Sequence, residues 1–105
     1  MTEGLLQDHI RLALNHPEAA WWRNNCGSAQ TRTGAWVKYG VGNPGGSDLI
    51  GVFRGRAVFA EIKTPTGRLS SDQLTFQRLV ERKGALYVVL RSVEDATALL
   101  ARLDG

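Results

Sequence analysis

Two acidic residues and one lysine in the middle of the sequence have the types and spacing that phosphate chemistry requires. Asp48 precedes one apolar run, Glu61 follows another, and Lys63 comes two positions after Glu61. Glu61 and Lys63 lie on one face if this segment is a strand, because strand side chains alternate. Two nearby carboxylates suit Mg²⁺ or Mn²⁺, which activates water and polarises a phosphoryl group, while an ammonium stabilises the developing negative charge. The alternative is a surface salt bridge between Glu61 and Lys63, with Asp48 as a turn residue.

A hairpin would bring the two acids together. If the chain turns through residues 54–55, Phe53 pairs with Arg56, and counting back places Asp48 opposite Glu61. Directly opposed residues have Cβ atoms about 5 Å apart. A three-residue turn would shift this register by one position, so the spacing is consistent with a paired site but does not require it.

Length and composition indicate one small domain over residues 1–105. No apolar run reaches the roughly 20 residues that span a bilayer, and the N-terminus lacks a signal-peptide pattern, so no membrane association is expected. Cys26 is the single cysteine and cannot form an internal disulfide. We therefore expect a reducing, cytoplasmic location.

The distribution of charge is more informative than the net charge of +3. Between residues 19 and 71 the only acids are Asp48 and Glu61, whereas seven residues are basic: Arg23, Arg32, Lys38, Arg54, Arg56, Lys63 and Arg68. A basic central region suits a polyanion such as nucleic acid. A solvated surface with chance clustering would look the same.

Periodicity and turn residues predict an α/β domain with a mixed sheet flanked by helices. Three apolar tryptophans, Trp21, Trp22 and Trp36, are interpreted as core residues rather than base-stacking platforms. The expected elements are a helix over 3–15, a short strand over 21–24, a loop over 25–34, a strand over 35–41, a loop over 42–46, strands over 48–53 and 57–63, a helix over 70–83, a strand over 86–90 and a last helix starting at 92–95 and carrying Leu103.

Several motifs resemble one known family. These are Gly46-Ser47-Asp48-Leu49-Ile50, Glu61-Ile62-Lys63-Thr64-Pro65, Gly67-Arg68-Leu69-Ser70 with Gln73, and the segments Trp22-Arg23-Asn24-Asn25, Tyr39-Gly40 and Arg91-Ser92-Val93-Glu94-Asp95. Together they resemble the VRR-NUC domains of the PD-(D/E)XK nuclease superfamily, in the small stand-alone form of phages and bacteria. The resemblance covers nearly the whole chain. It implies a restriction-endonuclease-like core of order α-β-β-β-α-β-α, with room for an additional short N-terminal strand.

The resemblance also implies roles for particular residues. Asp48 and Glu61 match the metal-binding acids, with the backbone carbonyl of Ile62 as a third ligand, and Lys63 matches the motif lysine. Gln73 matches an active-site glutamine, although Ser70 and Gln73 also fit a helix capping box. Glu3 matches an acid that completes the metal site directly or through water, although a first-turn acid also suits the helix dipole. Ser47 stands where the superfamily name expects proline.

Contacts with DNA are expected at eight residues, each of which could equally be an ordinary surface residue: Arg23, Asn25, Arg32, Lys38, Tyr39, Ser47, Thr64 and Arg68.

The expected activity is that of an Mg²⁺- or Mn²⁺-dependent, structure-selective DNA endonuclease of a bacterial or phage-infected cell. The resemblance favours a homodimeric Holliday-junction resolvase that uses no small-molecule cofactor. A flap or restriction-like nuclease with the same site, a non-catalytic DNA-binding module and an RNA-processing nuclease are the alternatives.

Overall fold

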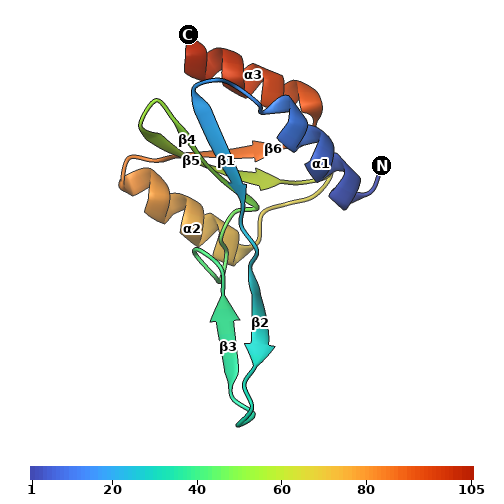
Figure 1. Ribbon diagram of the computed structural model, residues 1–105, viewed down its shortest axis with the longest axis vertical. Helices are drawn as coiled ribbons and strands as arrows, with labels where there is room; N and C mark the ends of the chain where they lie inside the picture. Colours follow the sequence, from blue (N-terminus) through green and yellow to red (C-terminus); the bar gives the residue numbers. More distant parts are fainter.

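The computed structural model describes residues 1–105 and contains a mixed sheet with helices on both faces (Figure 1). The strands of the main sheet lie in the order β1-β4-β5-β6, and every neighbouring pair is antiparallel except β5 and β6. In chain order the elements are α1 (Glu3–Ala13), β1 (Ala19–Arg23), β2 (Gly27–Gln30), β3 (Trp36–Tyr39), β4 (Leu49–Phe53), β5 (Arg56–Ile62), α2 (Ser71–Arg82), β6 (Leu86–Leu90) and α3 (Val93–Asp104).

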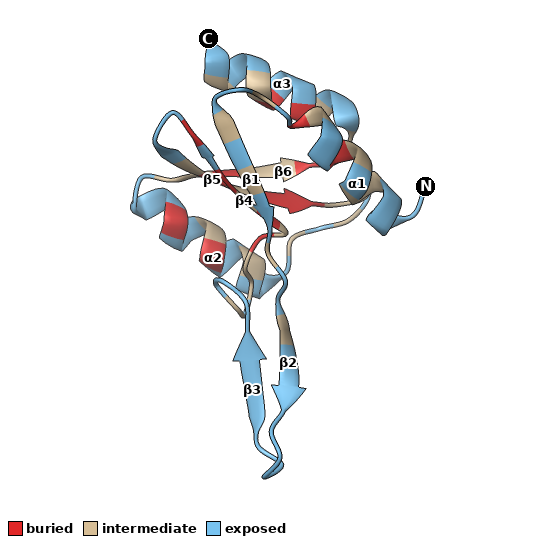
Figure 2. Cartoon of the chain, viewed as in Figure 1, coloured by how far each residue is buried: buried red, intermediate tan, exposed pale blue.

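Strand β5 divides the interior into two packed layers because its side chains alternate between the faces of the sheet. Val58, Ala60 and Ile62 are fully buried in a core that α1 and α3 cover. On the opposite face, Phe59 packs against Phe76 of α2. Glu61 and Lys63 share the face of Phe59, so the charged end of β5 lies in the layer of α2. Figure 2 shows the buried residues gathered on the sheet and on the inward sides of the helices.

The β4–β5 hairpin has the register that a two-residue turn implies, rather than the shifted register of a three-residue turn. Arg54 and Gly55 have φ angles of 49° and 81°, both in the left-handed region that a tight two-residue hairpin turn requires. Arg54 tolerates this conformation while forming ion pairs with Glu18 and Asp104. The ladder runs from Phe53↔Arg56 to Leu49↔Ala60. The next opposed pair is therefore Asp48 and Glu61.

A second, two-stranded sheet formed by β2 and β3 projects from the domain as an arm (Figure 1). We define the arm as residues 27–39. All of its residues except Gly27 are exposed (Figure 2), and the molecule measures 51 Å along its longest axis. The prediction of a loop over residues 25–34 was wrong, because Gly27–Gln30 is a strand whose sequence, Gly-Ser-Ala-Gln, shows no alternation of large apolar and polar side chains.

The placement of two tryptophans was also mispredicted. The side chains of Trp22 and Trp36 are 58% and 70% exposed, so neither belongs to the core. Trp21 is half-buried, packs against the main core, and donates from Nε1 to the Leu14 carbonyl at 3.0 Å. The helices otherwise follow the expected order, although α1 ends at Ala13, two residues early. No helix has both the length and the apolar composition needed to cross a membrane.

Candidate active site

The candidate site is a pair of carboxylates at the open end of the β4–β5 hairpin. Asp48 precedes β4, and its Oδ2 accepts a hydrogen bond from the Ile62 amide at 2.8 Å. Through this side-chain bond, the antiparallel pairing of β4 and β5 extends one residue beyond Leu49. Because the amide and carbonyl of one strand residue point to the same side, the Ile62 carbonyl also faces Asp48. The sheet therefore places the Ile62 backbone beside the two acids, and these are the three groups that the family resemblance implies as metal ligands.

Glu61 is an unusual residue for the inside of a strand, because its carboxylate is buried with incomplete partners. Its side chain is 5% exposed. Oε1 accepts from Gln73 Nε2 at 3.1 Å and lies 4.0 Å from Lys63 Nζ, whereas Oε2 is buried and accepts no hydrogen bond. Burial, and after it the charge of Asp48, raises the pKa of Glu61 to about 8, against an opposing effect of Lys63.

The hydroxyl of Tyr87 is the other buried side-chain oxygen without a partner. Tyr87 is opposite Phe59 in the sheet and packs in the same layer as α2. Burial and the negative charges of Glu61 and Asp48 raise the pKa of this phenol. Within this layer, Lys63 forms an ion pair with Glu61, with Nζ 4.0 Å from Oε1.

Gln73 completes the capping box expected for it and at the same time contacts Glu61. Its Oε1 accepts from the Ser70 amide at 2.8 Å, and the Ser70 hydroxyl accepts from the Gln73 amide at 3.2 Å, which completes a capping box at the start of α2. Its Nε2 meanwhile donates to Glu61. The first turn of α2 is therefore joined directly to the carboxylate pair.

The donor set fits a hard divalent cation. Glu61 Oε2 is an oxygen that folding removes from water without a hydrogen-bond donor, beside a second carboxylate. Buried charges of like sign in this arrangement are costly unless a cation compensates them. Mg²⁺ binds through one or two carboxylates and keeps several waters, so Asp48, Glu61 and the Ile62 carbonyl suffice without a third acid.

A cluster of amide hydrogen bonds fixes the segment that leads into Asp48. Asn24 Nδ2 donates to the carbonyls of Val41 and Ser47, Asn24 Oδ1 accepts from the Val41 amide, and the Asn24 amide donates to the Asp48 carbonyl. Asn24 thus ties the end of β1 to both ends of the 42–47 segment. In the sequence, Asn24 stood out only as part of the Trp22-Arg23-Asn24-Asn25 motif, and that motif implied no role for it.

Two further features position the site from the outside. Gly45 has φ of 95°, and a side chain there would collide with the backbone carbonyl of Asp72, so the 42–47 segment lies directly against the first turn of α2. Arg91 Nη1 donates to the carbonyls of Thr64 and Gly67 at 2.7 and 2.6 Å, which closes the turn after Lys63. Sequence reasoning missed the role of Arg91.

The remaining predicted site residues divide into accessible and inaccessible ones. Ser47 is 1% exposed and donates to the Leu49 carbonyl at 2.9 Å, so its hydroxyl is buried away from the surface where DNA would bind. Glu3 is exposed at the start of α1, and no group of three His, Cys, Asp or Glu side chains forms, so the structure does not bring Glu3 to the carboxylate pair. Thr64 is half-buried. The other DNA candidates are exposed: Arg23, Asn25, Arg32, Lys38, Tyr39 and Arg68.

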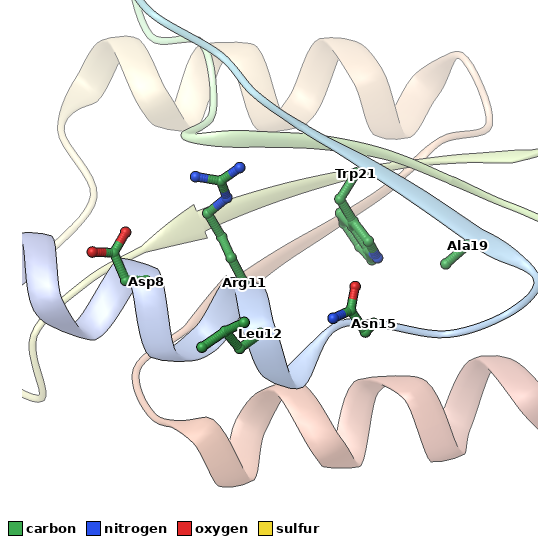
Figure 3. Close-up of a pocket in the computed structure, with 6 residues that line it drawn as sticks. All are labelled: Asp8, Arg11, Leu12, Asn15, Ala19 and Trp21. Atoms are coloured by element: carbon green, nitrogen blue, oxygen red, sulfur yellow. The ribbon is translucent and has the colours of Figure 1, made fainter.

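A hollow of about 430 Å³ lies elsewhere, between α1 and β1 (Figure 3). Its lining residues are Asp8, Arg11, Leu12, Asn15, Ala19 and Trp21. It contains none of the predicted site residues and no paired acids. The carboxylate pair, rather than this hollow, is therefore the candidate active site.

The fold and the acid pair together define a restriction-endonuclease-like α/β domain. Among solved structures, the chain is similar to one described as "VRR_NUC domain", with a TM-score of 0.67, 19% sequence identity and 94% of each chain covered. The fold that the motifs predicted is thereby confirmed. Comparison with protein-family models and with curated protein sequences finds no match.

Proposed function

We propose that this protein is a metal-dependent DNA endonuclease that hydrolyses phosphodiester bonds with Asp48 and Glu61 at its centre. The observation that carries the proposal is the buried Glu61 carboxylate, whose Oε2 lacks a donor while Asp48 faces it. A protein that only binds DNA gains nothing from two acids in a basic region, because they repel phosphate. The similar solved structure described as a VRR_NUC domain supports the nuclease assignment.

Each residue of the site has a distinct task in this proposal. Asp48, Glu61 and the Ile62 carbonyl hold Mg²⁺ or Mn²⁺, which when bound supplies an activated water and polarises the scissile phosphate. Gln73 fixes the orientation of Glu61 through the 3.1 Å hydrogen bond. The Lys63 ammonium, 4.0 Å from Glu61 Oε1, is placed to stabilise the negative charge that develops on the phosphate.

The proposed substrate is branched DNA, with a four-way junction cut by a homodimer. Exposed Arg23, which pairs with Leu49 beside Asp48, and exposed Arg68, which follows the Lys63 motif, supply phosphate contacts, and exposed Lys38 supplies another from the arm. Two symmetric sites would incise opposite strands of a two-fold junction, as the family resemblance implies. The same site would also serve a flap or restriction-like nuclease, so DNA structure is the variable that the experiment must change.

The test offers the protein a four-way junction, a flap and a linear duplex of matched length, with Mg²⁺ or Mn²⁺ titrated from zero. We expect metal-dependent cleavage of the junction and none by Glu61→Gln, which keeps the shape of the side chain. Glu81→Gln, an exposed acid on α2, is the matched control and should cleave normally. Flap cleavage without junction cleavage would replace the resolvase by a flap nuclease, and unimpaired cleavage by Glu61→Gln would refute the mechanism.

A further inference from the structure

The arm has two chemically different faces. Opposed residues of β2 and β3 share a face, and the register pairs Ser28 with Lys38 and Gln30 with Trp36. These four residues form the polar face of the arm. The other face carries Ala29 opposite Val37, together with Tyr39, whose ring lies over Gly27.

The charged residues of the arm are all basic. No acidic residue occurs between Glu18 and Asp48, a span that includes the whole arm. Lys38 lies on the polar face and Arg32 in the turn at the tip, and neither forms an ion pair. An extended element with unpaired cations and no acids is complementary to a polyanion.

The arm lacks the packing that normally supports a two-stranded ribbon. An isolated hairpin is marginally stable in water, yet Trp36 is 70% exposed and Val37 is 50% exposed. Local hydrogen bonds order the tip instead, where the Thr31 amide donates to the Ala35 carbonyl and Gln30 Nε2 to the Gly34 carbonyl. A bound partner would supply the contacts that the domain does not.

The root of the arm is fixed relative to the carboxylate pair. Asn43 Nδ2 donates to the carbonyls of Gly27 and Tyr39, both at 2.8 Å, and thereby bridges the first residue of β2 and the last of β3. Asn24, just before β2, bonds to the backbone of Asp48. DNA that reaches the acids therefore meets the arm in a set orientation.

We propose that the polar face of the arm is a second contact with branched DNA, an inference that rests on the proposed nuclease function. A two-stranded ribbon fits the major groove of a duplex. Lys38 contacts backbone phosphate there, and Trp36 stacks on a base left unstacked where the duplex arms diverge. The arm thus distinguishes a branch from a continuous duplex, while the carboxylate pair performs the hydrolysis.

Binding measurements on surface variants test this contact. Trp36→Ala and Lys38→Ala change the polar face, and Val37→Ser, one residue between them on the opposite face, is the matched control. Dissociation constants for a four-way junction and a linear duplex are measured by fluorescence anisotropy in EDTA. We expect Trp36→Ala to weaken junction binding about tenfold or more and duplex binding much less. Lys38→Ala should weaken binding to the junction and to the duplex. It should also reduce the slope of log affinity against log salt concentration by about one, as expected for one lost phosphate contact.

The outcomes separate this contact from the nuclease function, because binding is measured without metal. Junction cleavage by the wild type combined with unchanged junction affinity in Trp36→Ala would overturn the arm contact and keep the nuclease. Loss of junction affinity in Trp36→Ala, combined with no cleavage of any DNA by the wild type, would refute the nuclease function and keep the arm contact. If only Val37→Ser weakened binding and also converted a dimer into a monomer in sedimentation, the arm would be an interface between two copies and the proposal would fail.

Discussion

Replacing Glu61 by glutamine should stabilise the metal-free protein at neutral and alkaline pH. The folded protein keeps Glu61 protonated up to a pKa of about 8, whereas the unfolded chain releases this proton near the ordinary value of 4.5. The folded state therefore binds more protons than the unfolded state throughout this window. The free energy of unfolding accordingly falls as the pH rises from about 4.5 to about 8.

The size of the effect follows from the difference between the two pKa values. One pKa unit corresponds to about 1.4 kcal/mol, so ionising the buried Glu61 carboxylate costs on the order of 4 kcal/mol by pH 8. Glutamine carries no charge, and its carbonyl oxygen can still accept the hydrogen bond from Gln73. Wild type and Glu61→Gln should thus have equal stability near pH 4.5 and diverge steadily above it.

Urea unfolding followed by tryptophan fluorescence, at several pH values between 4.5 and 8 in EDTA, measures this divergence. Adding Mg²⁺ at pH 8 should raise the urea midpoint of the wild type and leave that of Glu61→Gln unchanged. The exposed-acid variant Glu81→Gln should follow the wild type. Parallel pH profiles for wild type and Glu61→Gln would refute the argument that a buried carboxylate with one unpartnered oxygen is held at this position.

Four further substitutions probe the residues around the acid pair. Lys63→Ala should lower the single-turnover cleavage rate about 100-fold or more while junction affinity in EDTA stays within about threefold, and a normal rate would remove Lys63 from the mechanism. Gln73→Ala should reduce cleavage strongly, whereas Ser70→Ala should cost only about 1 kcal/mol of stability by urea titration; equal cleavage by both variants would leave Gln73 as a cap alone. Asn24→Ala removes three side-chain hydrogen bonds and should lower stability by about 2 to 3 kcal/mol, so an unchanged urea midpoint would contradict its structural role.

The parts of the structure that the sequence predicted correctly are those governed by local rules. The Arg54-Gly55 turn set the hairpin register, and alternation then placed Asp48 opposite Glu61. Apolar periodicity located the helices and the buried strands. The capping box at Ser70 and Gln73 was equally readable, because it depends on residues three positions apart.

The mispredicted parts are exposed segments and contacts between residues far apart in the sequence. Strand β2 pairs only with β3 and has no core face, so no periodic pattern marks it. Trp36 was assigned to the core because tryptophan is usually buried, and only the projection of the arm reveals its exposure. The contacts of Asn24 and Arg91 span 17 to 27 residues, and no local pattern predicts such pairings.

The turn at Arg54-Gly55 lies at the opposite end of the hairpin from the acids, with five residue pairs between. It is exposed, and exposed turns generally tolerate insertions. Here one added residue that shifted the register would turn Glu61 to the wrong face of the sheet relative to Asp48. Among natural or engineered variants, length changes should therefore accumulate at the tip of the arm, around Arg32 and Thr33, and be absent from this turn.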